Sequence, residues 1–188
     1  MFVVRLFLIR HGQTEWSAVG RHTSHTDLAL TPNGEREARA LAARLVDRSF
    51  AAVVASPRLR ELRTAELAGL TVTRVDTDLA EWNYGEYEGL TTDQIHEHRR
   101  DWSLWTDGAP GGESPAEVSA RIDRALDRVS TVDGDVAVVG HGHALRVLTA
   151  RWLGLPAKDG SLFRLDSGTM CELAHEREQA VIQQWNLR

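Results

Sequence analysis

The sequence predicts an α/β fold in which a mostly parallel central sheet is flanked by helices. Short apolar runs typical of buried strands alternate along the chain with amphipathic stretches at helical spacing. No Pro/Gly/Ser-rich linker interrupts this pattern, and 188 residues suit one domain with a proper core. The composition, 42% hydrophobic and 26% charged, is that of an ordinary globular protein. We therefore expect residues 1–188 to form a single domain.

Six apolar runs are short enough, and rich enough in strand-forming residues, to be strands. In chain order they cover residues 2–9, 51–55, 72–75, 136–139, 169–173 and 180–185. The first and fourth runs are almost wholly apolar, as expected for strands covered by helices on both faces. Arg5 interrupts the first run and no small-residue cleavage site follows it, so a buried strand is a better interpretation than a signal peptide.

Helices are expected between these runs, because proline-containing start signals precede apolar residues at helical spacing. The signals are Thr31-Pro32, Ser56-Pro57 and the capping box Ser114-Pro115-Ala116-Glu117. The expected helices cover residues 32–48, 57–69, 115–129 and 143–153. The segment 81–112 is irregular and rich in Trp, Tyr and Gly, although Thr91 and Gln94 can cap a short helix within it.

Composition and charge argue against several classes of function. A net charge of −5 is unlike that of a protein that holds nucleic acid by its phosphates. No apolar run reaches the ~18–20 residues that a membrane span needs. Cys171 is the only cysteine, so an internal disulfide cannot form, which suits a reducing compartment such as the cytoplasm. Its apolar neighbours predict a buried structural thiol, and the apolar terminal strands would allow a homodimer.

Polar residues follow three of the predicted strands. Arg10 and His11 follow the first strand, Arg60 lies shortly after the second, and His141 follows the fourth. Because ligands bind beyond the carboxyl ends of parallel strands, we expect these four side chains to meet at one edge of the sheet. Glu81 lies in the irregular segment that can cover this edge.

These residue types suit phosphoryl transfer. Arginine donates paired, charge-assisted hydrogen bonds to phosphate oxygens, each worth roughly 1.5–3 kcal/mol. A neutral imidazole can attack phosphorus and carry the phosphoryl group covalently. A carboxylic acid with a raised pKa can then protonate the leaving alkoxide. Two histidines, two arginines and one glutamate therefore supply each group that the reaction needs.

The same residues lie in motifs that resemble the histidine phosphatase superfamily, also called phosphoglycerate mutase-like. The motifs follow the family's order: Arg10-His11-Gly12-Gln13-Thr14-Glu15-Trp16, Gly20 to Gly34, Ser56 to Ala65, Glu81 to Gly89, and Gly140-His141-Gly142. The resemblance covers nearly the whole chain and implies the family's three-layer fold.

The resemblance also implies roles for individual residues. His11 would be the phosphorylated nucleophile, and Glu81 would donate a proton to the leaving group and then activate water. The phosphoryl oxygens would be bound by Arg10, Arg60 and His141. The substrate pocket would be lined by Ser17, Thr23, Ser24, Tyr84, Gly142 and His143.

This sequence departs from the family's pattern at three positions. Many members have asparagine at the position of Ser17 and glycine at that of Ser24, and both changes bear on substrate shape rather than on the reaction. Arg58 stands where leucine is common. It is either a further phosphate contact or a solvated charge, and we favour the solvated charge.

The resemblance favours a phosphatase over a mutase. The segment between Glu81 and His141 lacks the long insertion of the mutases, which must hold a bisphosphate intermediate away from water. We expect a phosphomonoesterase that acts on a small phosphorylated metabolite such as a sugar phosphate, needs no metal or other cofactor, and is inhibited by vanadate. Mildly acidic pH should favour activity, because Glu81 must be protonated while His11 stays neutral. A phosphoglycerate mutase and a non-catalytic phospho-ligand binding protein are the alternatives.

The remaining histidines and tryptophans are expected to be structural or solvated. The pairs 96/98 and 141/143 lack the further ligands of a readable zinc site. His22, His25, His96, His98 and His175 are expected to be solvated, although His22 and His25 could line the mouth of the pocket. Trp16 either walls the pocket or packs away from it, and most other tryptophans are expected in the core.

Overall fold

The computed structural model describes residues 4–188 and contains one six-stranded sheet of order β3-β2-β4-β1-β5-β6. The strands are β1 (Leu6–Arg10), β2 (Ala52–Ala55), β3 (Arg74–Val75), β4 (Val136–Gly140), β5 (Met170–Glu176) and β6 (Gln179–Leu187). Strands β3, β2, β4 and β1 are parallel, β5 is antiparallel to β1, and β6 pairs antiparallel with β5. The mostly parallel sheet is confirmed, and residues 2 and 3 of the first predicted strand lie outside the described residues.

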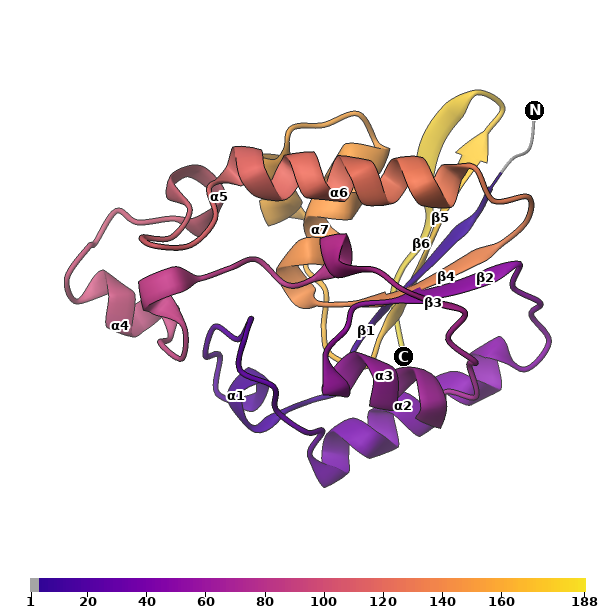
Figure 1. Ribbon diagram of the computed structural model, residues 1–188, viewed down its shortest axis with the longest axis horizontal. Helices are drawn as coiled ribbons and strands as arrows, with labels where there is room; N and C mark the ends of the chain where they lie inside the picture. Colours follow the sequence, from indigo (N-terminus) through magenta and orange to yellow (C-terminus); the bar gives the residue numbers. More distant parts are fainter. Residues whose placement is uncertain (1–3) are drawn as a thin grey trace.

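Helices cover both faces of this sheet, which confirms the three-layer α/β architecture (Figure 1). The helices are α1 (Glu15–Ala18), α2 (Pro32–Leu45), α3 (Leu59–Leu67), α4 (Thr92–His96), α5 (Leu104–Asp107), α6 (Pro115–Ser130) and α7 (Gly142–Trp152). Short 3₁₀ turns are η1 (Thr77–Leu79), η2 (Gly85–Tyr87) and η3 (Ala157–Leu162). Helices α2 and α3 lie on one side of the sheet, and α6 and α7 lie on the other.

Two apolar clusters separate the layers, and the central strand β1 contributes to both. Leu6 and Leu8 belong to the cluster beneath α6 and α7, whereas Phe7 and Ile9 belong to the cluster beneath α2 and α3. All four side chains are fully buried. Successive strand residues point to opposite faces, so a continuous apolar run is what a strand covered on both sides requires.

Most helix starts agree with the predicted signals. Thr31 caps α2, and Thr91 and Ser114 cap α4 and α6 in capping boxes with Gln94 and Glu117. The prediction for the helix after β2 is wrong in its cap: α3 begins at Leu59, and no side chain caps it. Ser56 points into the site instead, as described below. Helices α1 and α5 were not predicted, because each spans only one turn and carries no apolar periodicity.

The rest of the described chain agrees with two further expectations. Cys171 is fully buried on β5, and burial raises the pKa of its thiol to about 12, as expected for a structural cysteine. Within residues 4–188, no helix is both long and apolar enough to cross a membrane. Strand β6 forms an edge of the sheet, and the homodimer that terminal strands would allow stays a prediction.

Candidate active site

The site lies at the carboxyl ends of β1, β2 and β4. His11 follows β1, Ser56 follows β2, and His141 follows β4 as the N-cap of α7. The rings of His11 and His141 are 5.6 Å apart between centroids, and the hydroxyl of Ser56 is 2.7 Å from Nε2 of His141. The structure therefore brings together groups from three separate strand ends, as parallel topology requires.

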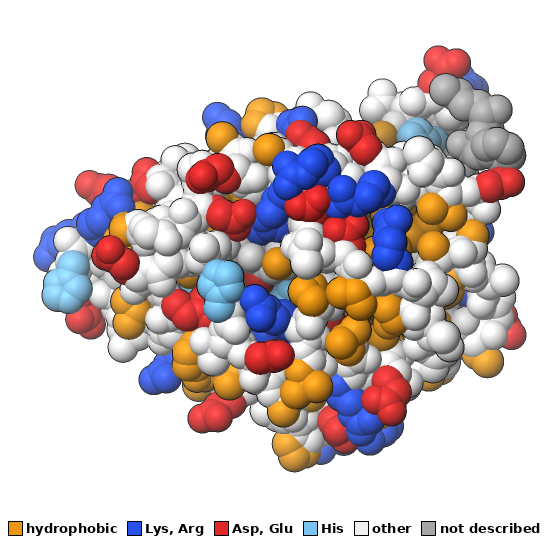
Figure 2. Space-filling view, viewed as in Figure 1, with side chains coloured by type: hydrophobic (Ala, Val, Ile, Leu, Met, Phe, Trp, Pro, Cys, Tyr) orange, Lys and Arg blue, Asp and Glu red, His pale blue; other side chains and the backbone are white. Residues whose placement is uncertain are grey.

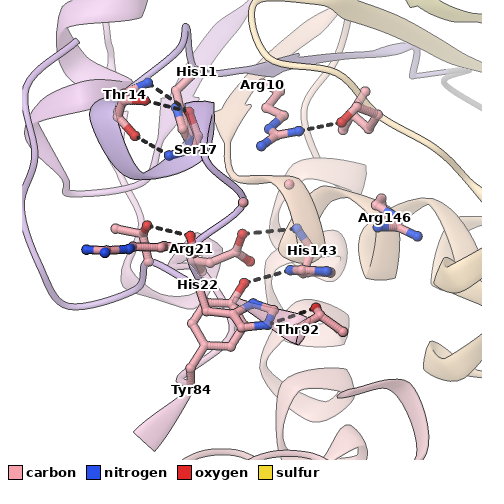
Figure 3. Close-up of a pocket in the computed structure, with 15 residues that line it drawn as sticks. Arg10, His11, Thr14, Ser17, Arg21, His22, Tyr84, Thr92, His143 and Arg146 are labelled. Carbon is pink, nitrogen blue, oxygen red and sulfur yellow. Dashed lines mark hydrogen bonds between the residues drawn. The ribbon is translucent and has the colours of Figure 1, made fainter. Parts of the chain in front are cut away.

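A pocket of about 230 Å³ opens above His11 (Figure 3). It is bounded by the loop after β1, the segment that follows η1, and the N-terminal turn of α7. Its lining residues are Arg10, His11, Thr14, Ser17, Gly20, Arg21, His22, Thr23, Glu81, Tyr84, Thr92, Gly142, His143, Arg146 and Leu165.

His11 is held as a neutral imidazole with one free ring nitrogen. Its Nδ1 lies 2.8 Å from the carbonyl oxygen of Gly12, and a carbonyl can only accept, so Nδ1 carries the proton. Burial, reinforced by the charges of Arg10 and Arg60, lowers the pKa of His11 to about 3. Its Nε2 therefore keeps an unshared electron pair near neutral pH, as a nucleophile requires.

Arg10 lies beside His11 and packs against the start of α7. A Cβ added to Gly142 would lie 3.2 Å from Cζ of Arg10, so a larger residue there would press on the guanidinium and displace it. The Arg10 guanidinium also donates to the carbonyl oxygen of Leu165. These contacts hold a half-buried cation at the pocket wall, where a phosphate anion can neutralise it.

Arg60 is placed differently from Arg10. It is only 1% exposed and does not line the pocket. Its Nη1 donates to the carbonyl oxygen of Thr26 at 3.1 Å, and its Nη2 donates to those of Thr23 and Ser24 at 3.4 Å each. Arg60 thus ties the loop after α1 to α3, and its direct contact with a phosphoryl oxygen stays a prediction.

Glu61 is a site residue that the sequence analysis missed. Its carboxylate is fully buried, and Oε1 lies 2.8 Å from Nδ1 of His141, 3.4 Å from Nε of Arg60 and 3.7 Å from Nε2 of His11. Burial raises the pKa of Glu61 to about 7, although His11 and Arg60 act in the opposite direction. One feature of the sequence could have indicated this role. Glu61 directly follows Arg60, a predicted site residue, in the first turn of a helix that follows a strand.

Glu81 sits at the N-terminus of α7 and caps its exposed backbone donors. Its carboxylate accepts hydrogen bonds from the backbone N–H groups of Ala144 at 2.8 Å, Trp82 at 2.9 Å and His143 at 3.0 Å. Burial alone would raise the pKa of this carboxyl, but the neighbouring histidines and these N–H donors lower it to about 2. The raised pKa expected for a proton donor is therefore wrong for Glu81 in this resting arrangement.

Tyr84, His143 and His22 form one wall of the pocket (Figure 3). The Tyr84 hydroxyl lies 2.6 Å from Nδ1 of His143 and acts as the donor, because burial holds the pKa of Tyr84 well above its usual value. His22 stacks at 4.6 Å from the Tyr84 ring and is only 8% exposed. The prediction that His22 is solvated is therefore wrong, and the alternative that it lines the pocket is correct.

The other predicted lining residues divide into two groups. Ser17, Thr23, Gly142 and His143 line the pocket, whereas Ser24 does not. The hydroxyl of Ser24 donates instead to Glu88 at 2.8 Å and is buried.

The positions of several other basic and aromatic residues relative to the pocket differ from the predictions. Arg21 and Arg146 line the pocket although neither was predicted there, and Trp16 does not line it. Arg58 lies outside the pocket and is half-buried beside Nδ1 of His25, at 3.1 Å, rather than fully solvated.

The charges around His11 favour an anion over a cation. Nitrogen and oxygen atoms of His11, Glu61 and His141 lie within 4.8 Å of one another, a spacing that would also suit a metal ion. However, the guanidinium of Arg60 lies 3.4 Å from Glu61 and that of Arg10 lines the same pocket, and both would repel a cation. His96, from the other predicted pair, bonds to the carbonyl oxygen of Trp102 at 2.9 Å.

The site combines a neutral, oriented imidazole with a neighbouring guanidinium at the carboxyl edge of a parallel sheet. This combination defines the class of protein as an α/β enzyme that transfers phosphoryl groups. The family model described as "Histidine phosphatase superfamily (branch 1)" matches residues 6–188. The chain belongs to this family and is a phosphatase of it.

Individual relatives agree with this assignment. An acid phosphatase from Mycobacterium tuberculosis is 45% identical over 187 residues, covering 95% of this chain and 91% of the relative. Sedoheptulose 1,7-bisphosphatase from Saccharomyces cerevisiae is 36% identical over 185 residues, covering 80% and 68% respectively. The solved structure of an open reading frame product of Mycobacterium tuberculosis has a TM-score of 0.91 at 43% identity, covering 97% of each chain.

A mutase name also occurs among the relatives. A protein named "Probable phosphoglycerate mutase GpmB" from Erwinia tasmaniensis is 32% identical over 195 residues, covering 97% of this chain and 90% of the relative. Both reaction names therefore occur among the relatives at comparable coverage.

Proposed function

We propose that the protein is a phosphomonoesterase that hydrolyses small phosphate esters through a phosphohistidine on His11. The observation that carries this proposal is the orientation of the His11 ring. Its Nδ1 proton is held by the Gly12 carbonyl at 2.8 Å, which leaves Nε2 unprotonated beneath the pocket. An oriented nucleophile with a lowered pKa is what a covalent phosphoryl transfer needs.

In the first step, Nε2 of His11 forms a bond to phosphorus as the bond to the ester oxygen breaks. Glu81 protonates the leaving alkoxide. In the resting pocket the pKa of Glu81 is about 2, but an entering phosphoryl dianion raises it, because a like charge disfavours the carboxylate. In the second step, Glu81 takes a proton from water, and the resulting nucleophile breaks the N–P bond and releases phosphate.

The residues that line the pocket favour a small substrate that carries a second polar or anionic group besides its phosphate. Arg21 and Arg146 line it, and neither forms an ion pair with a carboxylate of the described chain. Its volume of about 230 Å³ suits a compact ester such as a sugar phosphate. Relatives named for a sugar bisphosphate and for acid phosphatase activity agree with this substrate class. With its single buried cysteine, the protein suits the cytoplasm.

The test is hydrolysis of an aryl phosphate, with a metal chelator present, by wild type, His11→Ala and His98→Ala. His98 is exposed and does not line the pocket, so its variant controls for the loss of a histidine. We expect phosphate release by wild type and His98→Ala, none by His11→Ala, and an acid-labile phosphoenzyme in rapidly quenched wild type. Equal release by wild type and His11→Ala would reject the route through His11.

The mutase is the second candidate, supported by the mutase name of several relatives at 29–32% identity. A coupled phosphoglycerate mutase assay with and without a bisphosphate primer separates the two reactions. We expect phosphate release to exceed isomerisation in both conditions, because the segment 81–141 contains no long insertion to exclude water. Primer-dependent isomerisation that outpaces phosphate release would favour the mutase.

A further inference from the structure

We propose that Glu61 is a built-in anion that competes with the substrate's phosphoryl group for its binding groups, so that anion binding requires the uptake of one proton. This inference rests on the proposed function, because it concerns the same phosphoryl subsite. It adds a residue that none of the predicted motifs assigned a role.

The contacts of Glu61 are those that a phosphoryl oxygen would make. Its Oε1 reaches Nδ1 of His141 at 2.8 Å, Nε of Arg60 at 3.4 Å and Nε2 of His11 at 3.7 Å. These are the nucleophile and two of the three groups expected to bind the phosphoryl oxygens. A carboxylate oxygen and a phosphoryl oxygen are both anionic acceptors, so the two compete for Arg60 and His141, and both lie beside the unprotonated Nε2 of His11.

One proton is shared across the shortest of these contacts. Nδ1 of His141 lies 2.8 Å from Glu61 and 3.1 Å from Nη2 of Arg60, which can only donate. If Glu61 is protonated, it donates to Nδ1. If Glu61 is ionised, the Nδ1 proton points at Glu61 and is not available to a phosphoryl oxygen. Both carboxylate oxygens of Glu61 otherwise lack a hydrogen-bond partner in the described chain.

Glu61 is also the group in this cluster that changes charge near neutral pH. The titratable and charged groups that face it are His11 after β1, His141 at the start of α7, Arg60 beside it on α3, and Glu81 from the segment after η1. The pKa of Glu61 is about 7, whereas those of His11 and Glu81 are lowered to about 3 and about 2, and that of His141 is well below its usual value. Arginine remains a cation throughout.

Two states of the subsite follow. Below pH 7, Glu61 is neutral and carries no negative charge that competes with a dianion for Arg60 and His141. Above pH 7, Glu61 is ionised, and a dianion must either displace it against charge repulsion or bind with a proton. Linkage then makes the dissociation constant of the dianion rise about fivefold from pH 7 to pH 8 and about tenfold for each further pH unit, and leaves it nearly constant well below pH 7.

The experiment measures binding of sulfate by titration calorimetry between pH 5.5 and 8.5, in buffers of different ionisation enthalpy. Sulfate keeps two negative charges over this range and needs no turnover, so binding is measured separately from hydrolysis. For wild type, we expect the dissociation constant to rise about fivefold from pH 7 to pH 8, with close to one proton taken up per sulfate at pH 8. For Glu61→Gln, we expect constant affinity, no proton uptake, and at least tenfold tighter binding than wild type at pH 8.5.

Glu66→Gln is the matched control, because Glu66 lies on the same helix but is exposed and pairs with Arg63. It should behave as wild type. A wild-type affinity that does not change with pH, or proton uptake that persists in Glu61→Gln, would overturn the proposal. The proton uptake of wild type alone tests it if Glu61→Gln does not fold. Normal proton-coupled sulfate binding without aryl phosphate hydrolysis would reject the proposed function and leave the role of Glu61 intact.

Discussion

Two glutamates lie in the same buried site and have opposite shifts in pKa. Glu81 accepts three backbone hydrogen bonds at the start of α7, and its pKa falls to about 2. Glu61 receives no backbone donor from a helix start, and its pKa rises to about 7. Burial raises the pKa of both carboxyls, but at Glu81 the neighbouring histidines together with the backbone N–H donors outweigh it.

Replacement of Glu81 separates its role as proton donor from its role as a cap. In Glu81→Gln, hydrolysis of an alkyl phosphate should fall roughly 100- to 10,000-fold, because its alkoxide cannot leave without a proton. Hydrolysis of a nitrophenyl phosphate, whose leaving group needs no proton, should fall much less. The two substrates are compared by kcat/KM, which reports the first step and not the later attack of water, with the exposed Glu86→Gln as control. An equal loss of kcat/KM on both substrates would show that Glu81 does not protonate the leaving group.

Much of the site could be predicted from the sequence at the scale of single residues, but only where a motif marked the residue. His11, Arg10 and His141 meet as expected because their strands are parallel. Glu61 could not be predicted, because its role depends on the direction in which α3 begins. In the sequence, Ser56 is equally consistent with a helix cap. Its hydrogen bond to His141 depends on the ends of β2 and β4 lying side by side, which the local sequence does not indicate.

At the scale of elements, α6 holds the irregular segment that carries Glu81. Arg121 on α6 donates to the carbonyl oxygens of Ala80 at 2.7 Å and Glu81 at 3.2 Å, and it pairs with Glu113 at 2.6 Å. It is only 8% exposed. By contrast, the ion pairs of Arg124 and Arg128 with Asp78 lie on the surface, where basic and acidic side chains lie side by side over α6 (Figure 2).

Arg121→Ala should therefore loosen the segment that carries Glu81. We expect a loss of about 3–5 kcal/mol in unfolding free energy, because Glu113 would remain as a partly buried charge without its partner. The turnover number should fall together with stability. Arg124→Ala, one turn away and exposed, should cost less than about 1 kcal/mol. Urea unfolding and aryl phosphate hydrolysis measure both effects, and equal effects of the two variants would contradict this assignment.

The boundaries of the helices show which of them local sequence patterns can predict. The capped helices α2, α4 and α6 begin where side-chain caps predict, because a cap is a local interaction. Helix α3 begins two residues after the predicted position, because Ser56 bonds to a residue 85 positions away instead of capping its own helix. One-turn helices such as α1 and α5 are too short for a periodic pattern to indicate.

At the scale of the whole molecule, Glu61 couples global stability to pH. A carboxyl whose pKa is raised on folding contributes stability below its unfolded value, here 4.5, and this contribution is lost as pH rises to the folded value of about 7. The difference amounts to about 3 kcal/mol. We expect Glu61→Gln to gain stability relative to wild type between pH 5 and pH 8 by about this amount.

Urea unfolding of both proteins at pH 5 and pH 8, in buffer free of phosphate and sulfate, measures this change. Glu66→Gln, exposed on the same helix, should run parallel to wild type. A difference between Glu61→Gln and wild type that is the same at both pH values would show that Glu61 does not titrate in this range.

Strand β1 pairs with a neighbouring strand on each of its edges, and this pairing determines how mutations in β1 affect folding and activity. Arg10 is in register with Gly140 of β4, and Ile9 with Met170 of β5. A deletion or insertion of one residue in β1 would exchange the side chains that face the two cores, and the same shift would turn His11 away from the pocket. Damage in this strand is therefore all-or-none, whereas changes in the segment 81–113 can reduce catalysis by degrees in a chain that still folds.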